Sequence, residues 1–472
     1  MLSLVLLVVC CVLVRSSTTV FPLAVGDVGS HSAAFSHRAN ADAVSLRIFR
    51  ADDASQAHAV LVADMWLAAK TADYAIFVFW VDSLAAGTRY VAIAGEKNVS
   101  SHFRTAGSVN EVVRFGATSC LGGANKPWLT LSHASRANLS FMALLGDSIY
   151  ADGSTTIDEI RALWSSALRV QGMVDLLQTT PLVATWDDHE ITDDFTIDSI
   201  PVDLLRAGRR AFKEAIPAAH GDDPRAAFFN DSAPLWRTVR FGPVDLFVLD
   251  TRSDRSPTQR TYISAAQMRW ITHALRSSTA PFKFILNSIP ITDMTDFFLK
   301  VEERNFWTYH AYVAQRRELL AAAQGIPGVV FLSGDVHFGA LFHVGKTAAD
   351  PNYGFFEVVN GPGGSRINPM ILPVKFLRIF DVFDRQFTKL ITTWSFTLLT
   401  CDPSTRTVHI QFVDDLGELL WETELDVAAA TAKITHRGWN LRGETDADQE
   451  SLASLSMLCG LLIATAPFFL WP

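Results

Sequence analysis

Four uninterrupted apolar runs, each ending at a carboxylate, form the clearest pattern in this sequence. They end at Asp147, Asp187, Asp250 and Asp335. Runs of Val, Leu and Phe without polar alternation are typical of strands that are buried on both faces. Acids at the carboxyl ends of such strands lie where α/β sheets place their ligand sites. The pattern therefore predicts a buried sheet with an acid-rich edge.

Before residue 107 the pattern is different. Short alternating segments such as Ala43–Phe49, Ala75–Trp80 and Thr88–Ile93 are separated by turn residues. This spacing is typical of antiparallel strands. It predicts a small all-β sandwich of the fibronectin or immunoglobulin type over residues 19–106.

From residue 107 to residue 427 apolar strands alternate with helical stretches, which predicts an α/β domain. The expected helices are Ile157–Leu176, Val202–Ala215, Ser264–Arg276 and Tyr312–Ala323. The fold class is thus α/β: a layered β-sheet domain with flanking helices that follows a small all-β sandwich.

Two further elements are expected near the end of this domain. Apolar residues repeat at helical spacing between Phe376 and Leu390, which indicates a helix that packs on the core. Thr397–Cys401 and Val408–Val413 flank a turn and read as a closing hairpin.

Both ends of the chain carry targeting patterns. Residues 1–16 match a secretory signal peptide. Residues 452–472 are apolar and uncharged, and no Lys or Arg follows them, which favours a lipid-anchor signal over a transmembrane helix. Residues 428–451 read as a stalk, and sequons at Asn98, Asn138 and Asn230 fit a glycoprotein of the secretory pathway. We expect an extracellular or cell-surface protein that is anchored to a membrane through its tail or a lipid.

Composition and charge narrow the function classes. The chain has 472 residues, of which 49% are hydrophobic, and this is enough for two domains with sizeable cores. Its formal net charge of -9 repels polyanions, so we expect no nucleic-acid partner except as a substrate.

The cysteines leave an open question. Without the two chain ends, only Cys120 and Cys401 remain, and they could form a disulfide in an oxidising compartment.

The acids suggest metal-dependent chemistry. Hydrolysis of a phosphate ester needs neutralised phosphoryl oxygens and an activated water, and two adjacent metal ions provide both. Three acids and a histidine in Trp186–Glu190 follow an apolar run, where burial without a cation would be costly. Asp335 and His337 flank Val336, and in an extended segment both would point to one side. The alternatives are an exposed acidic loop and a capped loop with a solvated histidine.

Arg252 follows Asp250 by two residues. A guanidinium is suited to bidentate recognition of phosphate oxygens, but an Arg beside an Asp also commonly forms a plain ion pair.

Taken together, these segments resemble the PhoD-like alkaline phosphatases and phosphodiesterases of the metallophosphatase superfamily. The matching segments, which span residues 112–340, are Ala117-Thr-Ser-Cys120, Gly146-Asp-Ser-Ile-Tyr150, Trp186-Asp-Asp-His-Glu190, Leu249-Asp-Thr-Arg252, Trp307–Arg316 and Ser333-Gly-Asp-Val-His337.

The resemblance implies a site that holds Fe³⁺ and Ca²⁺ and acts on a phosphate-ester substrate. The implied metal ligands are Cys120, Asp147, Tyr150, Asp188, Asp335 and His337, with Asp147 bridging the two ions. The implied catalytic residues are His189, Arg252 and Asp187. Asp193, Asp194 and Asp254 depart from the usual pattern, and this leaves the substrate and the metal preference open.

The expected function is therefore hydrolysis of phosphate mono- or diesters by metal-activated water, by a secreted or surface-anchored protein. Two alternatives belong to other classes: a non-catalytic surface binding protein on the same fold, and a calcium-only lipid phosphodiesterase. A binding protein is expected to lose metal ligands, and a metal inventory separates the calcium-only enzyme from the iron form.

Overall fold

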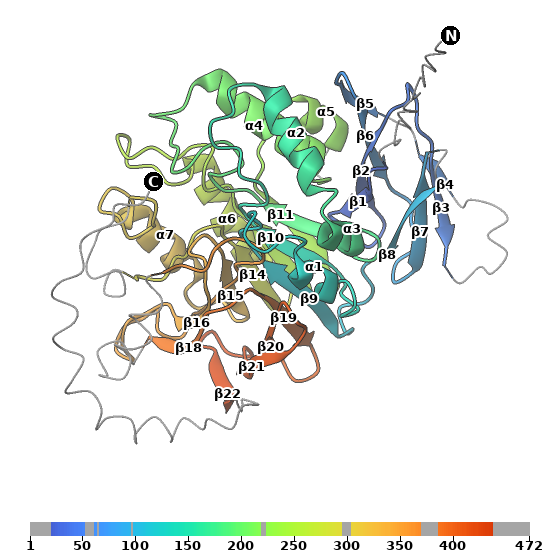
Figure 1. Cartoon of the computed structure of the whole chain (residues 1–472). Coiled ribbons are helices and arrows are strands. Elements are labelled where there is room, and N and C mark those ends of the chain that lie inside the picture. The colour runs from blue at the N-terminus through green and yellow to red at the C-terminus, as the bar shows by residue number, and fades with distance from the viewer. Residues whose placement is uncertain are drawn as a thin grey trace, which may run out of the picture.

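Two β-sheets packed face to face form the body of the protein, and helices cover both outer sides (Figure 1). The computed structural model describes residues 20–51, 61–63, 66–95, 98–218, 223–294, 304–369 and 386–437. The layered α/β class that the sequence predicts is confirmed.

Within the described ranges, the larger sheet has eleven strands in the order β22-β21-β20-β19-β9-β10-β11-β1-β2-β6-β5. Their bounds are β1 Leu23–Gly26, β2 Ala33–Ala39, β5 Trp66–Lys70, β6 Ala75–Val81, β9 Val113–Thr118, β10 Met142–Leu145, β11 Leu182–Thr185, β19 Ser395–Asp402, β20 Thr407–Asp414, β21 Leu419–Asp426 and β22 Lys433–Arg437. Strands β9, β10 and β11 are parallel, so their carboxyl ends share one edge.

The second sheet runs β12-β13-β14-β15-β17-β16-β18. Its strands are β12 Arg237–Phe241, β13 Val244–Val248, β14 Phe282–Leu286, β15 Val329–Ser333, β16 Gly339–His343, β17 Phe356–Val359 and β18 Phe387–Ile391. Strands β13, β14, β15 and β17 are parallel to one another. The four apolar runs of the sequence are therefore strands, as predicted, but β10 and β11 lie in one sheet and β13 and β15 in the other.

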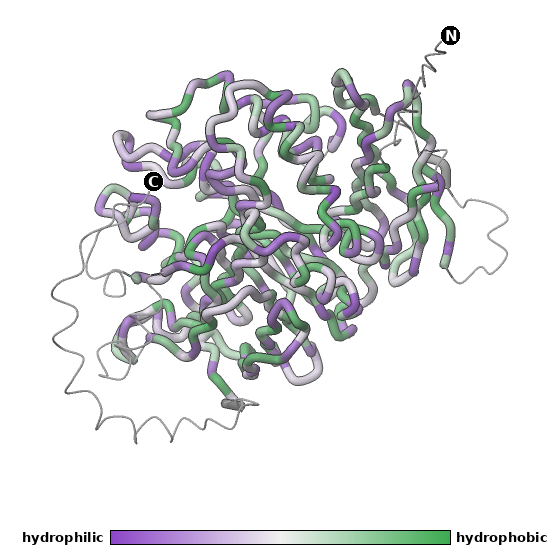
Figure 2. Tube along the Cα trace, viewed as in Figure 1, coloured by the Kyte–Doolittle hydropathy of each residue, from purple (hydrophilic) through white to green (hydrophobic). Residues whose placement is uncertain are grey.

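Side-chain alternation explains why the central strands are mostly apolar, and why β10 is wholly so. In β10, Ala143 and Leu145 face the core between the two sheets, while Met142 and Leu144 face a second core under the helices. Both faces exclude water, so every position favours an apolar residue. Figure 2 shows the green, hydrophobic strands at the centre of the molecule.

The helices cover the two outer faces. The larger sheet is covered by α1 Leu129–Ala134, α2 Ile157–Ala167, α3 Gln171–Leu177 and α4 Val202–Ala215. The second sheet is covered by α6 Ala265–Ser277 and α7 Val313–Ala323. A short helix, α5 Pro224–Phe229, follows α4. Thr156 caps α2 with a capping box, and Ser264 caps α6.

Most predicted helices are confirmed within a residue of their ends, with two corrections. The single helix expected from residue 157 to residue 176 is two helices, because the chain turns over residues 168–170 before α3 begins. The helix expected at Phe376–Leu390 is wrong over its last residues. There, Leu390 is buried in β18, which pairs with β16, and residues 370–385 lie outside the described residues.

The first strands form two sheets. β1, β2, β6 and β5 continue the larger sheet, and β3 Leu46–Arg50, β4 Leu61–Ala63, β7 Arg89–Ala94 and β8 Val99–Arg104 form a separate sheet in the order β4-β3-β7-β8. β1 pairs with β11 through Gly26 and Leu182, and Asp27 forms a buried ion pair with Arg237. These contacts tie residues 20–104 to the main body, so the expected domain boundary at residue 107 stays a prediction.

Other expectations about the chain have mixed outcomes. The hairpin of β19 and β20 is confirmed. Cys120 and Cys401 are both buried free thiols. The signal peptide, the apolar tail and most of the stalk lie outside the described residues. Among the described helices, none is long and apolar enough to span a membrane.

Candidate metal and phosphate site

Asp147 lies at the centre of the site, on a tight turn after β10. Gly146 has φ +92° and Asp147 has φ +55°, so the chain passes through two consecutive left-handed residues. A Cβ at position 146 would lie 2.6 Å from the Cβ of Asp187, which requires a glycine there. Asp147 is 2% exposed, and its Oδ1 is a buried atom without a hydrogen-bond partner in the described structure.

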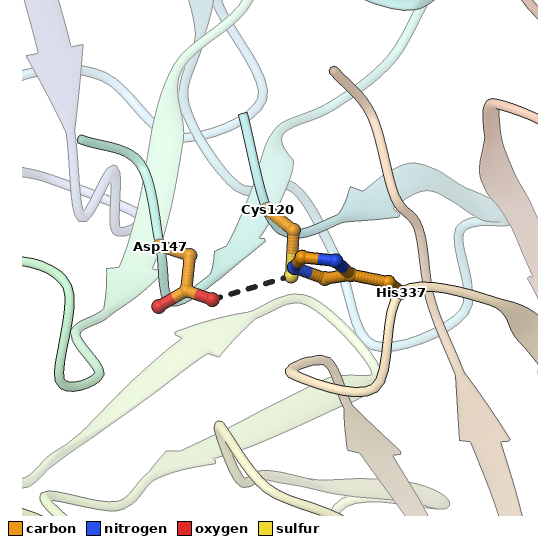
Figure 3. A group of neighbouring side chains, drawn as sticks. All are labelled: Cys120, Asp147 and His337. Atoms are coloured by element: carbon orange, nitrogen blue, oxygen red, sulfur yellow. Dashed lines mark hydrogen bonds between the residues drawn. The ribbon is translucent and has the colours of Figure 1, made fainter. Parts of the chain in front are cut away.

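One group of possible ligands comes from three separate loops. Cys120, Asp147 and His337 each offer a ligand atom within 4.8 Å of the others, and Figure 3 shows these side chains converging. Cys120 Sγ lies 3.4 Å from Asp147 Oδ2. The Oη of Tyr150 lies 3.2 Å from the Nε2 of His337, which places the phenol at the same group.

A second group is made of carboxylates. Asp187, Asp188 and Asp335 offer oxygens within 4.8 Å of one another. Asp188 also belongs to a group with Asp147 and His189, so the two clusters are connected through Asp147 and Asp188. The structure thus brings all six residues predicted as metal ligands into one continuous site.

Asp335 and His337 do not reach this site in the way that the sequence suggested. Both residues have positive φ angles, +66° and +58°, and the Val336 amide donates to the Gly334 carbonyl. The segment is therefore a tight bend and not an extended strand. As a result, Asp335 belongs to the carboxylate group, and His337 belongs to the group with Cys120.

Arg252 is fully buried beneath the carboxylates. Its Nε donates to Asp187 Oδ1, and its Nη2 lies 3.1 Å from Asp188 Oδ2. The guanidinium therefore forms an ion pair, but with Asp187 and Asp188 and not with the neighbouring Asp250, which pairs with Arg209. The predicted contact of Arg252 with phosphate stays a prediction.

His189 sits at the open side of the site. Its Nδ1 lies 2.9 Å from Asp152 Oδ2, and its Nε2 lies 3.8 Å from Asp193 Oδ1. The centroid of its ring lies 4.1 Å from that of Tyr150, and the two rings are tilted by 31°. The side chain is 20% exposed, so it is accessible to a bound molecule. Asp152 was missed in the sequence because it follows the motif at Gly146–Tyr150 without a pattern of its own.

Glu190 is a supporting residue whose individual role the sequence did not reveal. Its carboxylate accepts the backbone N–H groups of Asp147, Ser148 and Asp187 at 3.2, 2.7 and 2.8 Å. It therefore holds the two ligand-bearing turns together. The signal was present in the motif, but nothing local distinguished this acid from the ligands beside it.

Burial and mutual repulsion dominate the electrostatics. Burial raises the pKa of Asp147 well above its usual range, and the charge of Asp188 raises it further. Burial, Asp187 and Asp188 raise the pKa of Asp335 in the same way. Burial also acts to raise the pKa of Asp188, but Arg252 and His189 outweigh it and lower that pKa. Acidic side chains therefore outnumber basic ones in the site, and burial opposes the charged form of several of them.

The pKa values of His189 and His337 are shifted in opposite directions. Burial acts to lower the pKa of His189, but Asp152, Asp147 and Asp188 outweigh it and raise this pKa to about 11. Burial lowers the pKa of His337 to about 4, so its imidazole is neutral and available as a ligand.

Two layered sheets with clustered acids, a thiol and an imidazole at their shared edge define a metallophosphatase-type protein. The model of the family "PhoD-like phosphatase" matches residues 115–371. That is more than half of the chain, and the protein belongs to the PhoD-like phosphatase family.

Individual relatives are more distant. Alkaline phosphatase D of Bacillus subtilis (strain 168) is 28% identical over 194 residues, which cover 33% of this chain and 31% of the relative. The matched part thus spans about a third of that protein's length.

Two solved structures share the fold. The structure of PhoD matches with a TM-score of 0.71 and 16% identity, over 92% of this chain and 97% of that one. A purple acid phosphatase from yellow lupin (Lupinus luteus) seeds matches with a TM-score of 0.58 and 13% identity, over 86% and 73% of the two chains.

Proposed function

We propose that this protein is a metal-dependent phosphoesterase that hydrolyses phosphate mono- or diesters. The observation that carries the proposal is the pair of ligand groups connected through Asp147 and Asp188. Two adjacent cations can stabilise both the attacking and the leaving oxygen when a phosphoryl group is transferred to water. Membership of the PhoD-like phosphatase family supports the same activity.

The residues fit a pair of cations. Among the described side chains, Oδ1 of Asp147 and Oδ2 of Asp187 are buried oxygens without a hydrogen-bond partner. Buried carboxylates are costly unless a cation or a hydrogen-bond donor compensates them. Arg252 compensates Asp187 and Asp188 in part, but it does not reach Asp147.

The donor atoms support two different ions. Carboxylates alone, as in Asp187, Asp188 and Asp335, suit Ca²⁺. Thiolate, imidazole and phenolate, as in Cys120, His337 and Tyr150, suit a transition metal. With the family resemblance, this donor set leads us to propose Fe³⁺ at the group of Cys120, Tyr150 and His337, and it argues against a calcium-only enzyme.

Bound cations would neutralise the phosphoryl oxygens and lower the pKa of an attacking water. The protein's own residues have separate tasks. Arg252 fixes Asp187 and Asp188, Glu190 fixes the turns, and His189 holds a proton at Nε2 for the leaving-group oxygen.

The test is activity on a matched phosphate monoester and diester, before and after removal of metals with a chelator. We expect activity on at least one substrate, loss of activity on chelation, and recovery when metals are returned. Full activity of the metal-free protein would contradict the proposal.

Bound iron can be tested by visible absorption spectroscopy. A phenolate ligand to Fe³⁺ produces a visible charge-transfer band, so the protein should be coloured, and Tyr150→Phe should remove the band. An active protein without iron, in which Tyr150→Phe changes neither spectrum nor activity, would show that the iron assignment is wrong.

We also propose that the protein is secreted and held on the outer face of a membrane by a lipid, since residues 1–16 and 452–472 carry the matching patterns. Phosphatidylinositol-specific phospholipase should then release activity from intact cells. A protein that stays bound, and whose terminal peptide ends in Trp471-Pro472, would instead have a transmembrane anchor.

A further inference from the structure

Ser365 is a buried hydroxyl that faces the ligand group of Cys120, Tyr150 and His337 from a distant part of the chain. Its side chain is 4% exposed, and its Oγ lies 2.6 Å from the Oη of Tyr150. Ser365 belongs to the loop after β17, and the described part of that loop, residues 360–369, carries no acid and no motif of the site.

Four hydrogen bonds fix this serine. Its backbone N–H donates to the Cys120 carbonyl at 2.8 Å, and its carbonyl accepts from Trp394 Nε1 at 2.7 Å. Its Oγ accepts the Gly122 N–H at 3.1 Å and contacts Tyr150. A Cβ on residue 122 would lie 2.3 Å from the Ser365 Oγ, so Gly122 leaves the room that this contact needs.

The direction of the hydroxyl follows from these contacts. A hydroxyl has one hydrogen to donate and two lone pairs to accept with. The Gly122 N–H occupies a lone pair, and a Tyr150 oxygen that binds a cation as phenolate has no hydrogen of its own. The Ser365 hydrogen therefore points at the Tyr150 oxygen.

We propose that Ser365 is a positioning residue for the metal site, because it donates a hydrogen bond that orients the Tyr150 oxygen and draws electron density from it. Partners of this kind hold metal ligands in place, and their loss typically lowers metal affinity about 10–100-fold. The inference rests on the proposed function, in which Tyr150 is a metal ligand.

A matched control separates this role from simple support of the loop. Thr130 is also buried, and its Oγ1 donates to the Gly363 carbonyl of the same loop at 2.7 Å. No contact joins Thr130 to Tyr150 among the described hydrogen bonds. Thr130→Val therefore removes a hydroxyl that secures the loop but leaves the Tyr150 contact intact.

The experiment compares wild type, Ser365→Ala, Ser365→Thr and Thr130→Val by competition of the metal-loaded proteins with EDTA. The metal is iron if the purified protein contains it and Zn²⁺ otherwise. We expect Ser365→Ala to bind the metal about 10–100-fold more weakly, and the other two variants to stay close to wild type. With iron bound, the visible band of Ser365→Ala should also shift to longer wavelength, because the unbonded phenolate oxygen holds its electrons less tightly.

The outcomes are distinct. If Ser365→Ala binds metal as wild type does, or if Thr130→Val weakens binding equally, Ser365 only supports the loop and the inference is wrong. If Ser365→Thr does not fold, the comparison of Ser365→Ala with Thr130→Val still decides the question. If wild type binds neither iron nor Zn²⁺, the transition-metal assignment and this inference both fail, whereas loss of activity on chelation tests the proposed hydrolysis separately.

Discussion

Asp147 and Asp250 are two acids in similar places with different surroundings. Each follows a buried parallel strand, and each is 2% exposed. Asp250 Oδ1 accepts Trp186 Nε1 at 2.8 Å and the Ser253 N–H at 3.0 Å, and its Oδ2 lies 3.3 Å from Arg209 Nη1. Asp147 Oδ1 has no such partner in the described structure.

The difference shows that an acid at a strand end is not by itself a ligand. A carboxylate whose hydrogen-bonding capacity is met joins the loops around it, and Asp250 does this for the segments after β11 and β13. A carboxylate oxygen left unpaired in the interior is costly, and a bound cation would compensate it. The following predictions test this contrast.

Asp147→Ala should give the largest effect. We expect kcat to fall by about 10³-fold or more, because the variant removes the carboxylate shared by the two ligand groups. The metal-free protein should unfold at the same temperature as metal-free wild type or at a higher one, since a buried polar group with an unsatisfied oxygen is gone. Turnover above about a tenth of wild type would contradict the two-cation site.

Asp250→Ala should instead act on stability. Arg209 would remain buried without its carboxylate, and breaking such a pair costs about 3–5 kcal/mol of the free energy of unfolding. Denaturant titration measures this loss, and the fraction that stays folded should still bind metal. An unchanged denaturation midpoint would show that Asp250 does not stabilise the fold, and the proposed difference between Asp250 and Asp147 would be wrong.

Added metal should stabilise wild type and leave Asp147→Ala nearly unchanged. At a free metal concentration about 100-fold above Kd, binding to the folded state adds about 2.7 kcal/mol to the free energy of unfolding. The shift in melting temperature with and without chelator measures this effect. An equal shift in both proteins would place the stabilising metal elsewhere.

Arg252→Lys should have the smallest effect of the four. An ammonium cannot contact Asp187 and Asp188 in the way a guanidinium does, so we expect about 10–100-fold weaker metal binding. Inhibition by inorganic phosphate should change little once metal is saturating. Weaker phosphate binding with full metal occupancy would show instead that Arg252 contacts phosphate directly, as the sequence suggested.

Much of the fold was predictable because local patterns determine it. Strands such as β10 and β15 are buried on both faces and therefore consist mostly of apolar residues, and α4 follows its helical periodicity. How strands from two different sheets meet depends on contacts between distant segments. The pairing of β1 with β11 has no local signal for the same reason.

The site was predictable in part. The acids of the site could be recognised as clusters that follow apolar runs, and the family resemblance indicated Cys120 as a metal ligand. Asp335 and His337 belong to different ligand groups because both residues have positive φ angles. A prediction that assumes an extended segment places both side chains on the same side. Asp152 and Ser365 approach the site only through the folded chain, so their roles follow from the structure alone.

The central claim is that Asp147 lies between two cations. The most direct measurement is the metal content per chain of purified wild type and Asp147→Ala by elemental mass spectrometry, with activity measured on the same samples. The account predicts two metal ions per active wild-type chain and a large loss of both ions in the variant. Active wild-type protein without metal, or full metal content in Asp147→Ala, would contradict it.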